Sequence, residues 1–142
     1  MGQGGIKLKV VQVDTKQSRA TVRARRHKMF VGTWAPDYFD PQSNAIPYAT
    51  NDDDSDTAKN TGYAWRMHWY IPELTKEVAL AAKEVDTEKR KTMYEALQKK
   101  VTDEGPFAWM FQNANRVAMR ADVKDFRLGL FEDLNYYSTA TK

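Results

Sequence analysis

The sequence predicts an α/β (α+β) domain built from a βαβ unit, a helical hairpin and C-terminal strands. Three observations lead to this prediction. Apolar residues near the start alternate with lysines, as in a strand with one face on a core. Apolar residues in the second half recur at helical spacing. With 142 residues, 42% of them hydrophobic and 29% charged, the chain has the composition of a folded globular protein.

The βαβ unit is predicted for the first 34 residues. Ile6–Val13 reads IKLKVVQV and predicts a strand, and Asp14 has the carboxylate of a helix N-cap. Gln17 follows three residues later, as in a capping box, so we expect a helix over roughly Thr15–His27. The apolar run Lys28–Trp34 then predicts a strand buried on both faces. Two strands joined by a helix are expected to be parallel, with a right-handed crossover.

The rest of the chain predicts a long loop, two helices and further strands. We expect an ordered loop over Ala35–Tyr70, because no sustained period appears there. Two antiparallel helices should follow, with Pro72 and Glu73 suiting the first turn and Asp86 capping the second helix. Gly105 should end that second helix. Their predicted buried stripes are Ile71, Leu74, Val78, Ala81, Ala82 and Val85, then Met93, Tyr94, Leu97 and Val101.

The C-terminal part of the sequence predicts one bent strand or two strands. These cover Phe107–Phe111 and Arg116–Met119. An apolar tail from Phe126 to Tyr137 follows and is expected to dock on another surface.

Charge, cysteine content and hydropathy exclude several classes of protein. A net charge of +3 argues only weakly for nucleic acid, and the basic stretch Arg19–Lys28 has no aromatic residue to stack on a base. Zero cysteines exclude disulfides, thiolate zinc sites and thiol nucleophiles. No apolar run reaches the roughly 18 residues of a membrane span, and no secretory signal is present at Met1–Gly5. We therefore expect neither nucleic-acid binding nor membrane insertion.

The sequence supports no metal site, cofactor or enzyme motif. The acidic run from Asp52 to Asp56 resembles the start of an EF-hand loop, but Thr57 and Tyr63 occupy the positions that require Gly and Glu. His27 and His68 lie in no metal-binding pattern, and no serine has the G-x-S-x-G context. The acidic run is expected to be a solvated loop, and the prediction is of no enzyme.

The candidate ligand-binding site is Thr33–Pro41, directly after the second predicted strand. Its candidate residues are Trp34, Ala35, Asp37 and Tyr38. Ligands of open α/β sheets bind at the carboxyl ends of strands. A carboxylate in an apolar wall suits a ligand ammonium, and Trp34 or Tyr38 can cover the ligand with flat apolar area. A proline-stiffened turn, with Asp37 as a helix cap or turn acceptor, explains these residues equally well.

Several linked motifs in order resemble the C-terminal part of family 5 extracellular solute-binding proteins. These are the peptide, dipeptide and nickel-type receptors of ABC importers. The matching segments are GIKLKV at Gly5–Val10, MFVGTW at Met29–Trp34, APDYFDP at Ala35–Pro41, D-x-x-K-R-x-x-x-Y at Asp86–Tyr94, and Glu104–Phe126.

The resemblance implies a two-lobed periplasmic receptor that closes on its ligand and delivers it to an importer permease. Residues 1–142 would then be a single domain or fragment, the later half of the second lobe plus the C-terminal segment that returns toward the first. In peptide-binding members the Asp of the W-x-x-D-Y motif receives the peptide's α-ammonium, a role that carries over to Asp37. Next to this Asp, the resemblance places Trp34 and Ala35 on the adjoining wall of the ligand site. Pro36 departs from the family, which commonly has a small residue there.

The expected ligand is a small solute, most specifically an oligopeptide or dipeptide, bound without covalent chemistry. Opines, sugars and nickel complexes are alternatives that share the scaffold. A stand-alone protein-interaction module is another, and so is a small enzyme using Asp37 and Asp40 as a carboxylate pair. As a fragment, the chain is expected to cover its apolar surface by forming a homodimer.

Overall fold

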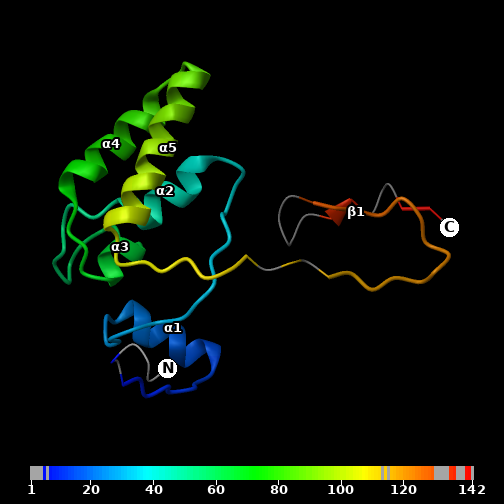
Figure 1. Ribbon diagram of the computed structural model, residues 1–142, viewed down its shortest axis with the longest axis horizontal. Coiled ribbons are helices and arrows are strands. Elements are labelled where there is room, and N and C mark those ends of the chain that lie inside the picture. Colours follow the sequence, from blue (N-terminus) through cyan, green and yellow to red (C-terminus); the bar gives the residue numbers. More distant parts are fainter. Residues whose placement is uncertain are drawn as a thin grey trace. The chain divides into compact units, whose positions relative to one another are not determined.

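The computed structural model describes residues 5, 7–112, 114, 116–129, 135, 136, 140 and 141. The chain divides into two units, Met1–Gly32 and Thr33–Lys142, and each is treated by itself. The helices carry the labels α1 to α5 along the chain (Figure 1). No described helix has the length and apolar character needed to cross a membrane.

The first unit contains helix α1, Thr15–Arg23. The predicted N-cap is confirmed, because the Asp14 carboxylate accepts a hydrogen bond from the Gln17 backbone N–H at 2.8 Å. The helix ends four residues before the predicted His27. Arg25 has a φ of 55°, in the left-handed region that terminates helices.

The two strands predicted beside α1 are not formed within the described residues of the first unit. Ile6 lies outside those residues, and 7–13 and 28–32 contain no strand. Val10 is 87% exposed and Val31 is 77% exposed. A parallel strand pair is normally buried inside a larger sheet that is covered on both faces. No such sheet is present among the described residues, so these apolar side chains have no core to enter.

The helical hairpin of the second unit is confirmed. Helix α4 spans Pro72–Lys83 and helix α5 spans Thr87–Glu104. Asp86 caps α5 by accepting from the Lys89 backbone N–H at 2.8 Å, and Gly105 is its C-cap. Lys100 on α5 also donates to both carboxylate oxygens of Glu77 on α4, at 2.6 and 2.7 Å.

Two helices lie within the predicted loop Ala35–Tyr70, so that prediction was wrong for these residues. They are α2, Pro41–Ala49, and the short α3, Tyr63–Arg66. Gly62 allows them to approach closely, because a Cβ there would lie 2.9 Å from the backbone of Pro47. The sequence does contain the start signal of α2, an aspartate followed by a proline.

The core of the second unit lies where α2, α4 and α5 pack together (Figure 1). Most of the predicted stripes are buried, but Val85 is 93% exposed because it follows the end of α4, and Ala82 is only half-buried. The buried core residues are Ala49, Leu74, Val78, Ala81, Tyr94, Leu97 and Val101.

The C-terminal strands differ from the predicted ones. The described residues of Phe107–Phe111 and Arg116–Met119 form no strand. Phe107 instead packs on the core as a single aromatic side chain. A short antiparallel pair forms later, between β1 (Arg127–Leu128) and β2 (Asn135–Tyr136). The described residues are therefore mostly helical, and the βαβ unit is not observed.

We predict that Leu97→Ala lowers the free energy of unfolding by about 3 kcal/mol, because it leaves a cavity in the core. Leu80 on the neighbouring helix is 60% exposed, whereas Leu97 is 3% exposed. Leu80→Ala is the matched control and should change stability by less than about 0.5 kcal/mol. Urea unfolding followed by circular dichroism measures both. Equal effects of the two substitutions would show that this hairpin does not form the core.

Candidate ligand-binding site

The predicted site residues precede helix α2, and the start of this helix determines the path of their backbone. The Asp40 carboxylate caps α2 by accepting a hydrogen bond from the Gln42 backbone N–H at 2.8 Å. Pro41 occupies the first turn, where its missing N–H costs nothing. The helix cap of this segment is thus Asp40, and Asp37 stands outside the helix.

Trp34 is held by contacts with three residues of the second unit. Its indole Nε1–H donates to Oδ1 of Asn44 at 2.9 Å. Its ring meets Tyr48 and Tyr63 edge to face, with centroids 6.0 and 5.8 Å away. Those two tyrosines stack on each other at 5.0 Å. Trp34 nevertheless remains 37% exposed, so it presents a fixed but accessible aromatic surface.

The aromatic cluster extends from Tyr48 toward the segment after α5. Phe107 and Trp109 both contact the Tyr48 ring, with centroid distances of 5.1 and 5.0 Å. The Arg66 guanidinium lies 4.8 Å from the centroid of Tyr63. Burial raises the pKa of the Tyr48 phenol well above its ordinary value of 10, so this ring stays neutral at physiological pH.

Asp37 is held through its backbone, whereas its carboxylate is exposed. Its backbone N–H donates to Oγ of Ser43 at 2.8 Å. Within the part of the chain that the structure describes, no hydrogen bond or ion pair to the Asp37 carboxylate is formed. Tyr38 is 45% exposed, and Ala35 is exposed as well. Such a carboxylate can pair with a ligand cation without first breaking a bond within the protein.

Asp40, the second carboxylate of the segment, is engaged in an ion pair that connects α2 to α5. Its Oδ1 lies 2.8 Å from Nη2 of Arg90. The Arg90 guanidinium also lies 4.9 Å from the centroid of Tyr94. The hydrogen bond from Arg90 holds the pKa of the Asp40 carboxyl below its ordinary value of 3.8. Asp40 therefore fixes the position of α2.

Sequence reasoning missed the residues that hold this segment in place. These are Ser43, Asn44, Tyr48, Tyr63 and Arg90. The Asp40-Pro41 pair is a helix start signal, and its recognition would have placed Ser43 and Asn44 on one helical turn next to the site. No sequence signal relates Arg90 to Asp40, because the two are 50 residues apart.

The acidic run between α2 and α3 forms local turns. The Asp53 carboxylate accepts from the Ser55 backbone N–H at 3.0 Å, and Asp54 pairs with Nδ1 of His68 at 3.0 Å. Among the described residues, no three His, Asp or Glu side chains gather as ligands of a metal ion.

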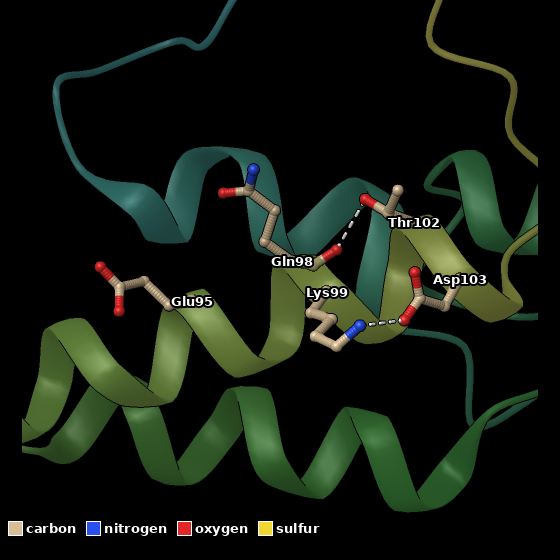
Figure 2. A pocket seen from close by; sticks show the side chains of 5 residues that line it. All are labelled: Glu95, Gln98, Lys99, Thr102 and Asp103. Carbon is tan, nitrogen blue, oxygen red and sulfur yellow. Dashed lines mark hydrogen bonds and ion pairs between the residues drawn. The ribbon is translucent and has the colours of Figure 1, made fainter.

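A shallow pocket on α5 does not include the predicted site. Figure 2 shows that its side chains all come from this one helix, where Lys99 pairs with Asp103 at 2.6 Å. Its lining is Glu95, Gln98, Lys99, Thr102 and Asp103. These polar side chains of successive turns are typical of a solvated helix face.

Comparisons with known proteins found no matching protein-family model, no matching curated protein and no matching solved structure.

We predict that Asp40→Asn lowers the free energy of unfolding at pH 7 by about 0.5–1 kcal/mol, because it removes the charge that Arg90 binds. Asparagine keeps an oxygen for the helix cap, so the loss reports the ion pair. The folded-state pKa of Asp40 is lowered. Its stabilising contribution is therefore complete above the unfolded pKa of about 3.9 and lost as the pH falls through the folded value.

Urea unfolding of both proteins between pH 7 and about pH 2 measures this difference. The difference in unfolding free energy between wild type and Asp40→Asn should disappear at the acidic end of this pH range. The exposed Asp52→Asn is the control and should stay close to wild type throughout. An Asp40→Asn gap that is equally large at both ends of the range would rule out the charge pair as its cause.

Proposed function

We propose that this chain is part of a receptor that captures a solute with a cationic amine, most specifically a short peptide. In this proposal it belongs to the family 5 solute-binding proteins and acts in the periplasm. The loaded receptor delivers its ligand to the permease of an ABC importer. Binding is non-covalent, and the chain acts as a receptor without enzymatic activity.

One observation carries the proposal: an exposed carboxylate and an immobilised aromatic ring come from the same short segment. Asp37 and Trp34 are three residues apart, and adjacent residues of α2 hold them. A carboxylate supplies the charge that an ammonium requires, and an indole supplies flat apolar area and cation–π contact. Because Trp34 is already fixed, little further ordering of its side chain is needed on binding.

In the proposed mechanism, the ligand ammonium pairs with Asp37 while the rest of the ligand lies against Trp34. A second lobe then closes over the ligand and removes water. A charge-assisted hydrogen bond gains strength when water is excluded, so closure and binding reinforce each other. Ala35 and Tyr38 border this contact and are exposed enough to meet the same ligand.

The exposed apolar residues outside the helical core support a larger receptor. Val10, Val31 and Met110 are 87%, 77% and 69% exposed. In the complete receptor, the segments 6–13 and 28–34 would enter a sheet as the two strands of the βαβ unit. The segment after α5 would return toward the first lobe. Burial of such residues gives about 25 cal/mol per Å² of apolar surface, which favours this assembly.

An alternative function is a stand-alone module that binds another protein or a second copy of the chain. The observation in its favour is the exposed apolar segment after α5, in which Trp109 is 56% exposed and Phe111 is 74% exposed. This alternative gives Asp37 no role. Opines, sugars and nickel complexes are the alternative ligands within the receptor proposal, and among these only a neutral sugar would have no cationic group for the Asp37 charge.

We predict that, in the receptor, Asp37→Ala weakens binding of a free dipeptide by about 100-fold or more. Loss of one partner of a buried charge pair typically costs about 3–5 kcal/mol. N-acetylation of the peptide should weaken binding to a similar degree, because it removes the ammonium. Asp37→Ala and N-acetylation combined should weaken peptide binding little more than either one alone, because both remove the same interaction.

Isothermal titration calorimetry with free and N-acetylated peptides measures these affinities. Asp37→Asn keeps the shape of the side chain and should resemble Asp37→Ala. Asp52→Ala removes an exposed carboxylate elsewhere and should bind as wild type does. Equal affinity of the wild type for free and acetylated peptides would contradict the assignment of Asp37.

A further inference from the structure

Two consecutive residues of helix α2 each hold one residue of the candidate site. Ser43 accepts the Asp37 backbone N–H through Oγ at 2.8 Å. Asn44 accepts the Trp34 indole N–H through Oδ1 at 2.9 Å. The Asp37 backbone and the Trp34 ring are thereby attached to neighbouring positions of one helical turn.

The two hydrogen bonds differ in their surroundings. Ser43 is 4% exposed, so its hydroxyl holds the Asp37 backbone in a buried environment, where a hydrogen bond is electrostatically stronger than in water. Asn44 is exposed, and the Trp34 ring that it holds is fixed additionally by Tyr48 and Tyr63. A change at Asn44 should therefore alter the Trp34 contact while leaving the fold intact.

Helix α2 is itself fixed relative to the hairpin. Its N-cap residue Asp40 is paired with Arg90 of α5 at 2.8 Å, and Ala49 near its other end is 1% exposed in the core. The two side chains that hold the Asp37 backbone and the Trp34 indole therefore belong to a helix that contacts the hairpin near both of its ends.

We infer that Ser43 and Asn44 are positioning residues that set the ligand specificity of this site. Ser43 positions the Asp37 backbone for the ammonium, and Asn44 positions Trp34 for an apolar group next to that ammonium. The preferred ligand is a short peptide whose N-terminal residue has an apolar side chain. This inference rests on the proposed function, because it assigns separate tasks to two residues behind the same site.

The test uses NMR titration of the 142-residue chain, which can follow affinities in the millimolar range. The probes are Leu-Gly, Gly-Gly and N-acetyl-Leu-Gly, and the signals are the Asp37 amide and the Trp34 indole N–H. Wild type should prefer Leu-Gly over both other probes. Hydrogen exchange of the Asp37 amide is recorded for each variant without ligand.

Each variant should lose a different preference. Ser43→Ala should speed exchange of the Asp37 amide and reduce the preference for Leu-Gly over its acetylated form by about fivefold, the effect of one hydrogen bond. Asn44→Ala should reduce the preference for Leu-Gly over Gly-Gly by a similar factor and keep the requirement for a free amine. Asn44→Asp keeps an acceptor for the indole and should restore the preference for Leu-Gly over Gly-Gly.

The outcomes separate this inference from the proposed function. If wild type binds free and acetylated peptide equally, or binds neither, the proposed function fails in its assignment of Asp37 to the ammonium, and the inference fails with it. If wild type requires the amine but Asn44→Ala and Asn44→Asp both keep the wild-type preferences, the inference alone is overturned. Because Asn44 is exposed, this result can be obtained even if Ser43→Ala does not fold.

Discussion

Asn51, which is 1% exposed, joins the end of α2 to the segments that lead into α3 and α4. Its backbone N–H donates to Oγ1 of Thr75 at 2.9 Å, and its carbonyl oxygen accepts from the Ile71 backbone N–H at 2.8 Å. Its side-chain Nδ2 donates to Oδ1 of Asp54 at 3.1 Å and to the Trp69 carbonyl at 2.9 Å. The side-chain amide group of Asn51 thus donates to part-buried acceptors in two separate segments, and its loss would leave the Trp69 carbonyl without this donor.

The hydrogen bonds of Asn51 affect the candidate site because they hold the segment between the two tyrosines that contact Trp34. The segment that Asn51 organises connects α2, which carries Tyr48, to α3, which carries Tyr63. The stack of these two rings forms the surface on which Trp34 rests, and α2 also supplies the acceptor Asn44. The proposed ligand wall is accordingly supported by the hydrogen bonds of Asn51 and by the aromatic contacts around Trp34. Immobilising a wall before the ligand arrives reduces the entropy lost on binding.

Much of the helical part could be predicted from the sequence because its signals are local. Asp14, Asp86 and Gly105 act as the caps that their residue types and neighbours indicate. The strands predicted at 6–13 and 28–34 do not form among the described residues, and local signals could not reveal this, since a strand requires a pairing partner that its own sequence does not contain. For the site, local signals indicated Trp34 and Asp37. The residues that hold them depend on contacts between distant segments, such as the pair Asp40–Arg90.

The most direct measurement is the effect of Asn51→Ala on stability and on the Trp34 indole signal. The substitution removes two side-chain hydrogen bonds and leaves the part-buried Trp69 carbonyl without this donor. We predict a free energy of unfolding lower by about 2–4 kcal/mol and a shifted Trp34 indole resonance in the NMR spectrum of the folded protein. An unfolding free energy within about 0.5 kcal/mol of wild type, together with an unchanged Trp34 resonance, would contradict a central role for Asn51.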